Sequence, residues 1–357
     1  MKLMIAGGGT GGHLFPGIAL AGAWVERAPK GEVFFVGTER GLEVKIVPAA
    51  GYRLELIDQV GIKRRGLVQT LKGLFMLPKS ILQSMRIVRR EKPAVAVGVG
   101  GYAAGPAILA AWLLRVPTLI LEPNAVPGLT NRILAKIARV AISPYERAAA
   151  YFGKKLVKAG IPVRPQIANA LKTAAATAQA RRGVLVFGGS QGAKAINDAV
   201  MQAAPRWAQS GVRVVHQTGP ADRARVEAAY AGMGIDVRDF IHDMAAEYAA
   251  CDLVVCRAGA SSLAELALCG KPAVLIPLPT AADDHQTKNA QAFADAGAGV
   301  LLRQSELTPE RLDTTVRELL GDVTKLMAMA DAAKKLGDPD AASRLADMCI
   351  NLAESCP

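Results

Sequence analysis

Short apolar runs alternate with longer amphipathic stretches along this chain, and the alternation predicts strands followed by helices. In the first half, the runs predicted as strands are Lys2–Ala6, Val33–Val36, Ala94–Val99, Thr118–Leu121 and Val140–Ile142. A second series covers Gly183–Phe187, Val212–His216, Leu253–Cys256 and Ala273–Ile276. Strands that are apolar along their whole length are typical of parallel sheets with crossover helices. The chain is therefore predicted to be an α/β protein with two doubly wound domains.

A Pro- and Gly-rich segment at residues 160–165 interrupts this pattern near mid-chain, as interdomain linkers do. We expect a first domain over 1–163, a second over 164–340, and a helix over 341–357 that packs back towards the first domain. The alanine-rich stretch Ala168–Ala180 is predicted to be a helix or a surface loop. The cleft between the domains is the expected active site, since ligands of such folds bind at the carboxyl ends of the strands.

The composition excludes several classes of protein. The 357 residues suffice for two domains, and 51% of them are hydrophobic while only 5% are aromatic. No apolar run reaches the ~18–20 residues of a membrane span, and no signal peptide is expected. The five cysteines lack metal-ligand spacing, which favours reduced thiols in a cytoplasmic protein. Neither a metal nor another cofactor is expected.

The formal net charge of +12 is concentrated in residues 61–92, where nine Lys and Arg residues stand against one acidic residue, Glu91. A basic segment attracts polyanions. No nucleic-acid motif or stacking aromatics accompany the charges, so nucleic acid is not an expected partner. The apolar run Leu74–Pro78 between them favours a peripheral patch on the cytoplasmic side of the cell membrane. The alternative is an amphipathic helix whose apolar positions are all core: Leu67, Leu71, Leu74, Leu82, Met85 and Val88.

The first predicted strand is followed by Gly7–Gly12, five glycines and a threonine, and then by His13. A turn with few Cβ atoms lets backbone N–H groups approach an anionic or sugar ligand, and a helix N-terminus adds partial positive charge. His13 would place a titratable imidazole beside that ligand. The alternative is a tight strand-to-helix turn with a capping histidine.

The glycine turns do not fit the standard nucleotide fingerprints. Gly7–Gly12 contains Gly-x-Gly-x-x-Gly, but no acidic residue ends the second strand, Val33–Val36, to bind a ribose. A second turn, Gly188–Gly192, is followed by Ala193 instead of the Lys-Ser/Thr of a phosphate loop. Both observations count against an NAD enzyme and a nucleoside triphosphatase.

Two further turns end strands of the first domain and are expected on the same sheet edge. They are Gly98–Pro106, which contains Tyr102, and Leu121–Asn124. The second brings Glu122 towards His13, and a carboxylate and an imidazole on one wall can act as a general base pair. The alternative for Glu122 is a surface salt bridge.

In the second half, Cys256–Glu265 opens a helix with small and hydroxyl residues, which suits a diphosphate. Glu265 lies one turn into that helix, where it could accept both ribose hydroxyls. A capping box between Ser262 and Glu265 fits the spacing equally well.

Two acidic segments resemble metal sites at first sight. In Asp283–Asn289 the aspartates are predicted to cap a helix, so that Gln286 and Asn289 point at a sugar. Residues 338–340, Asp-Pro-Asp, follow no strand and are predicted to be a turn and a cap.

Taken in order, these motifs resemble the MurG family of peptidoglycan N-acetylglucosaminyltransferases. The matching residues in the first half are Gly8–His13, Gly100–Tyr102, Asn124, Gly128–Asn131 and Pro162–Arg164. In the second half they are Gly188–Ala193, Asn197, Phe240–Ile241, Asp243–Met244, Cys256–Ala260, Glu265, Gln286 and Asn289. Each motif alone is weak, whereas the ordered set is specific and, with the terminal elements, covers nearly the whole chain.

The resemblance implies a GT-B fold, two Rossmann-like domains facing each other across a cleft. It implies an inverting transfer of GlcNAc from UDP-GlcNAc to the muramyl 4-hydroxyl of undecaprenyl-linked lipid I, giving lipid II for peptidoglycan synthesis. His13 is then the first candidate for the general base, and Glu122 is the second.

The resemblance also implies substrate-contacting residues, which in the first domain are Thr10, Gly11, Gly12, Tyr102, Asn124 and Asn131. In the second domain they are Arg164, Ser190, Asn197, Ile241, Arg257, Ala260, Ser261, Ser262, Leu263, Ala264, Glu265 and Gln286. By this carry-over Glu265 holds the ribose, the Ile241 backbone the uracil, and Gln286 the sugar hydroxyls. Without a metal signature, helix N-termini and Arg164 would stabilise the leaving diphosphate.

Two departures from the family pattern stand out. Pro123 replaces a usual glutamine beside Glu122, which weakens Glu122 as a base, and Ser261-Ser262 replaces a Thr-containing pair while keeping a hydroxyl. Three alternatives remain: a UDP-sugar 2-epimerase of the same fold, an NAD oxidoreductase and a non-enzymatic polyanion-binding protein. The basic apolar segment argues against the first and the missing acid against the second, while net charge alone supports the third.

Overall fold

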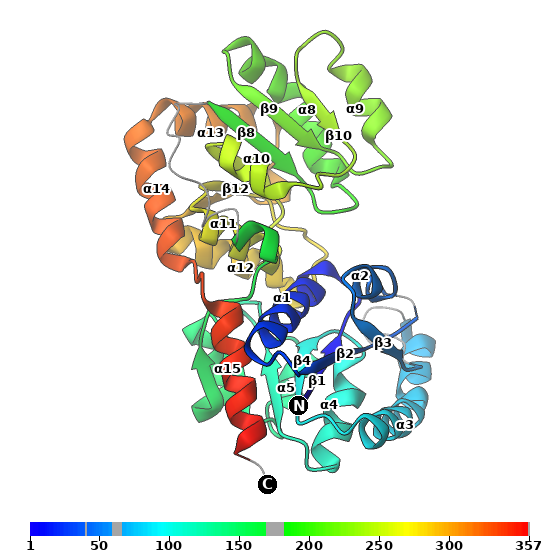
Figure 1. Cartoon of the computed structure of the whole chain (residues 1–357). Helices are drawn as coiled ribbons and strands as arrows, with labels where there is room; N and C mark the ends of the chain where they lie inside the picture. Colours follow the sequence, from blue (N-terminus) through cyan, green and yellow to red (C-terminus); the bar gives the residue numbers. More distant parts are fainter. Residues whose placement is uncertain (40, 59–65, 169–181, 356–357) are drawn as a thin grey trace. The chain divides into compact units, whose positions relative to one another are not determined.

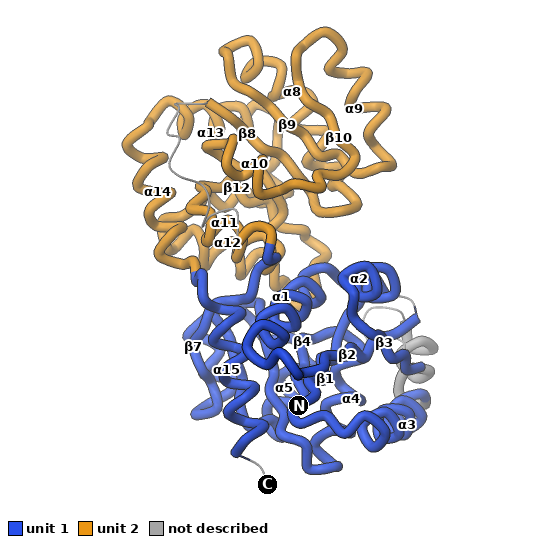
Figure 2. Tube along the Cα trace, viewed as in Figure 1, with its two compact units in different colours: residues 1–165, 338–357 blue, residues 166–337 orange. Residues whose placement is uncertain are grey.

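The computed structural model describes residues 1–39, 41–58, 66–168 and 182–355, and for 66–75 the backbone only. The chain divides into two compact units: unit 1, Met1–Pro165 with Asp338–Pro357, and unit 2, Gln166–Gly337 (Figure 2). Each unit is a parallel sheet covered by helices (Figure 1). The prediction for Ala168–Ala180 falls almost wholly outside the described residues.

Unit 1 contains a seven-stranded sheet in the order β3-β2-β1-β4-β5-β6-β7. The strands are β1 (Lys2–Gly7), β2 (Glu32–Gly37), β3 (Arg53–Leu56), β4 (Val95–Gly100), β5 (Thr118–Leu121), β6 (Val140–Ser143) and β7 (Leu156–Lys158). The helices are α1 (Gly11–Arg27), α2 (Glu43–Ala49), α3 (Gly66–Glu91), α4 (Ala104–Leu113), α5 (Leu129–Leu134), α6 (Ala149–Phe152) and α15 (Ala341–Glu354), with 3-10 turns η1 (Glu146–Ala148) and η2 (Gly153–Lys155). β4 is buried along its whole length, as a strand covered on both faces must be.

Unit 2 repeats this plan with a six-stranded sheet in the order β10-β9-β8-β11-β12-β13. The strands are β8 (Gly183–Phe187), β9 (Arg213–Gln217), β10 (Asp236–Arg238), β11 (Leu253–Cys256), β12 (Ala273–Leu275) and β13 (Gly299–Leu301). The helices are α8 (Lys194–Gln209), α9 (Arg223–Ala229), α10 (Met244–Ala250), α11 (Ala260–Cys269), α12 (His285–Asp295), α13 (Pro309–Gly321) and α14 (Val323–Leu336), with η3 (Ala282–Asp284) and η4 (Gln304–Glu306). In both units the first strand is central, so the turn that follows it lies in the middle of the sheet edge.

All nine strands predicted from apolar runs are present, to within one residue at each end. The pattern missed β3, β7, β10 and β13, which are the outermost strands of the two sheets. Each of the four is partly exposed to solvent, whereas the predicted central strands are buried. An edge strand has one side without a neighbour, so its residues need not form an apolar run.

The last helix, α15, packs against α1 within unit 1. Asp338 holds the chain ahead of this helix, because its carboxylate accepts the Gly160 N–H at 2.8 Å and pairs with Arg344. The Asp340 N–H donates to Asp338 Oδ1 at 3.2 Å. The Asp-Pro-Asp segment is therefore a turn, as predicted, that fastens the returning chain.

In the described part of α3, the inner face carries Ser80, Ser84, Ile87 and Val88. The two serine hydroxyls donate to carbonyls four residues earlier in the helix, which allows their burial. Leu82 is 58% exposed, so its assignment to the core is wrong: the serines occupy the face it was expected to share. Within the described ranges, no helix combines the length and apolar character needed to cross a membrane.

Candidate active site

The first glycine turn of unit 1 joins β1 to α1 and is built around a buried carboxylate. Gly9 has a φ of +85°, a conformation that glycine adopts without strain. Its N–H donates to Glu43 Oε2 at 2.8 Å, and Glu43 Oε1 accepts the N–H and the hydroxyl of Thr38, both at 3.0 Å. Glu43 is 1% exposed and is the first residue of α2. A side chain that the motifs did not reveal therefore fixes the shape of this turn.

His13 is the third residue of α1, and Thr10 occupies the cap position, so the alternative of a capping histidine is wrong. His13 Nδ1 lies 3.3 Å from Thr10 Oγ1. The opposite edge of the ring packs on Gly100, where an added Cβ atom would lie only 3.0 Å from Nε2. The Gly8 N–H donates to the Gly100 carbonyl at 3.3 Å. The turns Gly7–Gly12 and Gly98–Pro106 are thus in contact, and the imidazole of His13 lies where they meet.

Glu122 follows β5 and is 2% exposed, so the alternative of a surface salt bridge is wrong. Its Oε1 accepts the N–H of Asn124 at 2.9 Å and Asn124 Nδ2 at 3.0 Å. Its Oε2 accepts the Gly128 N–H and Asn131 Nδ2, both at 3.0 Å. Burial raises the pKa of this carboxyl, although the four hydrogen bonds oppose the shift. The carboxylate therefore braces the loop that leads to α5.

Pro123 leaves the sheet intact beside Glu122, whose N–H donates to the Ile142 carbonyl at 2.8 Å.

Tyr102, in the turn Gly98–Pro106 of unit 1, is 45% exposed. The Arg164 guanidinium carbon lies 5.3 Å from the centre of the Phe15 ring, in the first turns of α1. Arg164 therefore lies beside the start of α1, and residues up to 165 belong to unit 1.

The glycine turn of unit 2, Gly188–Gly192, is held by a neutral side chain. Gln217, the last residue of β9, donates from Nε2 to the Gly189 carbonyl at 3.0 Å. The same carbonyl accepts the Gly192 N–H at 2.8 Å, and Ser190 is exposed at the tip of the turn. Gln217 Oε1 accepts the Ile241 N–H at 2.9 Å. The Gln217 side chain thus joins the Gly188–Gly192 turn to the Ile241 backbone, which is expected to bind uracil. The N–H of Ile241 is already used in this contact.

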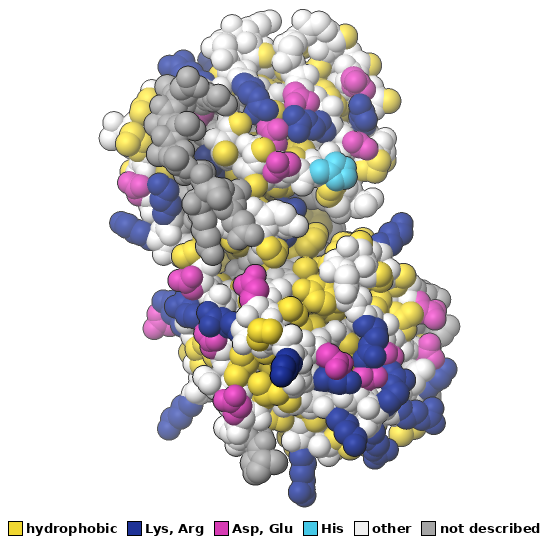
Figure 3. Space-filling model, in the orientation of Figure 1, with side chains coloured by type: hydrophobic (Ala, Val, Ile, Leu, Met, Phe, Trp, Pro, Cys, Tyr) yellow, Lys and Arg dark blue, Asp and Glu magenta, His cyan; other side chains and the backbone are white. Residues whose placement is uncertain are grey.

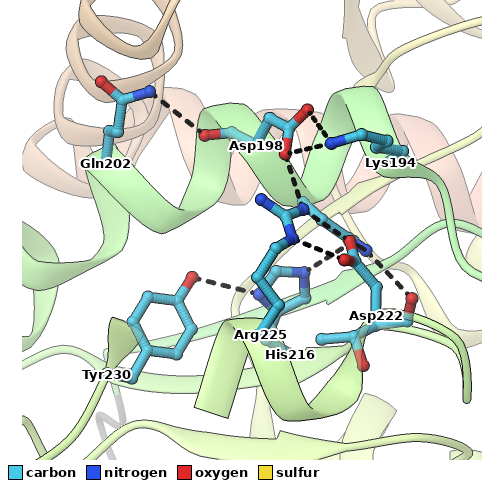
Figure 4. A network of polar contacts seen from close by, with 9 residues as sticks. Lys194, Asp198, Gln202, His216, Asp222, Arg225 and Tyr230 are labelled. Carbon is cyan, nitrogen blue, oxygen red and sulfur yellow. Dashed lines mark hydrogen bonds and ion pairs between the residues drawn. The ribbon is translucent and has the colours of Figure 1, made fainter. Parts of the chain in front are cut away.

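Asn197 is buried in a polar network, of which Figure 4 labels His216, Asp222 and Tyr230. Its Nδ2 donates to the Thr218 carbonyl at 3.0 Å and to Asp222 at 2.7 Å, while its Oδ1 lies 3.1 Å from His216 Nε2. His216 Nδ1 lies 3.1 Å from the Tyr230 hydroxyl. Burial lowers the pKa of His216 to about 4. Asn197 therefore supports the turn from behind.

Helix α11 begins with an open N-terminus. Its cap residue is Gly259, which has no side chain to bond the first amides, so the capping box between Ser262 and Glu265 is wrong. The first intrahelical bond runs from the Leu263 N–H to the Gly259 carbonyl at 3.0 Å. Glu265 is 5% exposed, and the Tyr248 hydroxyl donates to its Oε2 at 3.1 Å. The amides of the first turn of α11 are suited to an anion.

Arg257 turns away from this helix and braces the neighbouring backbone. It donates to the carbonyls of Ile276 and Pro277 at 3.1 and 3.0 Å and to Gln304 Oε1 at 2.7 Å. Burial lowers the pKa of its guanidinium, which the three acceptors hold in place. Arg257 thus fixes the backbone at the end of β12.

Asp284 occupies the cap position of α12, but its side chain makes no cap hydrogen bond. Asp283 and Asp284 both have left-handed backbone angles, with φ of +53° and +54°, a strained conformation for residues other than glycine. Gln286 Oε1 accepts the Leu278 N–H at 3.0 Å, and Asn289 is buried with Nδ2 3.3 Å from the Ala258 carbonyl. Among the described residues, no group of three or more His, Cys, Asp or Glu side chains could hold a metal ion.

The site geometry agrees with what comparisons of the chain show. The glycosyltransferase family 28 N-terminal domain matches residues 3–143, and the family 28 C-terminal domain matches residues 183–345. A UDP-N-acetylglucosamine--N-acetylmuramyl-(pentapeptide) pyrophosphoryl-undecaprenol N-acetylglucosamine transferase of Anaeromyxobacter dehalogenans is 49% identical, over 99% of this chain and 93% of that relative. The crystal structure of Acinetobacter baumannii MurG matches with a TM-score of 0.80 and 32% identity, over 98% of this chain and 99% of the other.

The chain belongs to the MurG branch of glycosyltransferase family 28.

Family membership decides between the alternatives that the sequence left open. The two Rossmann-like units are the GT-B fold of this family, as predicted, and the chain is a glycosyltransferase. A UDP-N-acetylglucosamine 2-epimerase of Listeria monocytogenes also matches, with a TM-score of 0.68 over 96% of this chain and 94% of the other. Its 16% identity shows a shared fold alone. An oxidoreductase or a binding protein without activity does not fit the family.

The structure brings most of the expected residues to the carboxyl ends of the two sheets, and it adds two that the motifs missed. Glu43, the first residue of α2, and Gln217, the last residue of β9, each hold a glycine turn. Glu43 lies several residues beyond the end of Val33–Val36, so a motif that requires an acid directly after that strand does not include it. The flanking Gly37 and Gly41 are the available signal, since a Cβ atom at either would overlap the Glu43 side chain.

Proposed function

We propose that this enzyme transfers GlcNAc from UDP-GlcNAc to the 4-hydroxyl of the muramyl sugar of lipid I, inverting the anomeric carbon and giving lipid II. The observation that carries the proposal is the 49% identity, over 99% of the chain, to a transferase named for that reaction. We assign acceptor activation to unit 1 and donor binding to unit 2.

In unit 1, His13 is the general base. The imidazole tautomer that donates from Nδ1 to Thr10 Oγ1 leaves Nε2 with a lone pair for the acceptor hydroxyl proton. The N–H groups of Gly11 and Gly12, at the start of α1, approach the sugar. Tyr102 contacts the substrate and Asn124 the donor, while Glu122 and Asn131 hold the loop. Because its oxygens already accept four hydrogen bonds, Glu122 is the weaker candidate for the base.

In unit 2, the Ser190 turn and the first amides of α11 hold the diphosphate. The small and hydroxyl residues Ala260, Ser261, Ser262 and Ala264 at that helix start give the ligand room, while Leu263 contributes its backbone and packs in the core. Glu265 binds the ribose, the Ile241 carbonyl the uracil, and Gln286 the sugar hydroxyls. Asn197 and Arg257 of this unit act indirectly by bracing backbone. Arg164, a residue of unit 1, supplies the charge that stabilises the leaving diphosphate.

Mixing the enzyme with UDP-GlcNAc and a lipid I analogue tests the proposal. We expect formation of the disaccharide product and release of UDP. The same enzyme with UDP-GlcNAc alone is the control, since an epimerase would produce the 2-epimer without acceptor. A folded protein, judged by circular dichroism, that yields no disaccharide would contradict the proposal.

We also propose that the segment 61–92 rests on an anionic membrane surface. In Figure 3, Lys and Arg side chains gather on the part of unit 1 that carries β3 and α3. Exposed Leu82 lies one turn from exposed Arg86 and near Arg89, which places apolar surface beside positive charge. Lys79 is less available, since it pairs with Asp58 at 2.6 Å.

Replacing Phe75 and Met76 by serine should weaken binding to liposomes that contain anionic lipid. Lys154 and Lys155, basic residues of the same unit away from α3, supply a control pair for replacement by serine. Sedimentation with liposomes measures both variants. Unchanged binding of the first variant would assign that segment to the protein core.

A further inference from the structure

We propose that Glu43 is a positioning residue that shapes the catalytic turn of unit 1 and keeps its first half from binding phosphate. The proposal rests on the function above and deepens it. Glu43 contacts neither the acceptor nor the donor in this account and acts through Gly9 and the start of α1.

The contacts of Glu43 tie together the two loops that follow β1 and β2. One carboxylate oxygen accepts the Gly9 N–H at 2.8 Å, and the other accepts both donors of Thr38 at 3.0 Å. The Glu43 side chain is only 1% exposed, and a buried charge requires hydrogen-bond partners. The three donors supply them. Moving the carboxylate would therefore move the turn that leads into His13.

The space around Glu43 is cleared by glycine. A Cβ atom at Gly8 or Gly41 would overlap the carboxyl group of Glu43, and one at Gly37 would overlap its Cγ atom. Gly8 belongs to the motif that resembles a phosphate-binding turn, yet here its missing side chain makes room for an acid. The glycines of the first turn thus serve a protein carboxylate as well as a ligand.

Charge separates this turn from a phosphate cradle. An anion-binding turn offers free N–H groups and the positive end of a helix. Here Gly9 gives its N–H to Glu43, and the negative charge beside it offsets the partial positive charge at the start of α1. The amides of Gly11 and Gly12, at the start of α1, remain for a ligand.

The variant Glu43→Gln tests the role with little change in volume. Its amide can keep the Thr38 contacts or the Gly9 contact, but it cannot accept all three hydrogen bonds. We expect kcat to fall at least about tenfold, while KM for UDP-GlcNAc, bound by unit 2, stays within about twofold. Hydrogen–deuterium exchange of the amides of residues 8–12 should become faster.

Asp313→Asn is the matched control. Asp313 is also 1% exposed, and it accepts hydrogen bonds from Trp207, Arg206 and Arg317 in unit 2. This variant should lose thermal stability yet keep wild-type kcat and wild-type exchange in residues 8–12. Thr38→Val, which removes one of the three donors and leaves Gly9 bonded, should show a smaller loss of kcat than Glu43→Gln.

Wild-type kcat in Glu43→Gln, or a loss no larger than that of an equally destabilised Asp313→Asn, would overturn the proposal. So would unchanged exchange in residues 8–12. The exchange measurement needs no substrate, so it decides the positioning role even if the wild-type enzyme shows no transfer. An inactive wild type would instead overturn the proposed function.

Discussion

The turns Gly7–Gly12 and Gly188–Gly192 each follow the first strand of their sheet. They are held by side chains of opposite character. In unit 1, the carboxylate of Glu43 accepts the N–H of Gly9. In unit 2, the amide of Gln217 donates to the carbonyl of Gly189. The first arrangement consumes a backbone donor and adds negative charge, whereas the second covers a backbone acceptor and adds none.

This difference fits the proposed assignment of acceptor activation to unit 1 and donor binding to unit 2. A turn whose carbonyl is covered presents its amides to an anion, as the diphosphate of the donor requires. A turn that holds a carboxylate repels an anion and suits a hydroxyl next to a base. Both turns are rich in glycine, with five glycines in Gly7–Gly12 and three in Gly188–Gly192. The side chain that holds each turn, Glu43 or Gln217, is the clearer difference between them.

The largest effect should come from His13→Ala in unit 1. General base catalysis contributes about 10²–10⁴-fold, so we expect kcat to fall at least about tenfold. The affinity for UDP should stay unchanged, because we assign donor binding to unit 2. Initial rates and UDP titration calorimetry measure the two quantities. Loss of UDP affinity would break the division of tasks, and wild-type turnover would leave His13 with a structural role only.

Acid should loosen the turn of unit 2 through His216. Its pKa is about 4 in the folded protein against 6.5 for the free side chain, so between these values the unfolded chain binds more protons. This contribution to stability is complete above pH 6.5, and it falls by up to about 3 kcal/mol as the pH drops to 4. Urea unfolding at pH 7 and pH 4.5 measures the loss. His216→Gln, which does not titrate, should show a smaller pH dependence, and an equal dependence would assign the effect to other groups.

A smaller effect is expected when the turn of unit 2 is given the charge of unit 1. Gln217→Glu replaces a donor to Gly189 by an acceptor and places negative charge beside the diphosphate, which should weaken UDP binding about tenfold, or about 1.4 kcal/mol. Gln202→Glu, which adds the same charge on the exposed face of α8, is the control. If both variants bind UDP as the wild type does, the character of the side chain behind the turn does not matter.

The sequence was informative where burial was complete. Central strands such as β4 are covered on both faces and must be apolar, so their pattern revealed them. Edge strands such as β3 and β13 carry no such requirement. The same reasoning explains Leu82, because two serines bonded to their own helix took the buried face.

The candidate site was predictable in its motifs but not in its internal contacts. Local spacing placed Gly9 in the turn after a strand and Glu265 one turn into a helix, since turn and helix-start chemistry depends on neighbouring residues. It could not show that Gly259 leaves α11 without a capping box, which spacing alone suggested. Nor could it show that Glu43 and Gln217 reach back to a turn, because those contacts join segments distant in sequence.

Hydrogen–deuterium exchange with and without UDP tests the division between the two turns most directly. We predict that UDP slows exchange in residues 189–193 and 260–262 and leaves residues 8–12 unchanged. Protection of residues 8–12 by UDP, without protection of 189–193, would contradict the account.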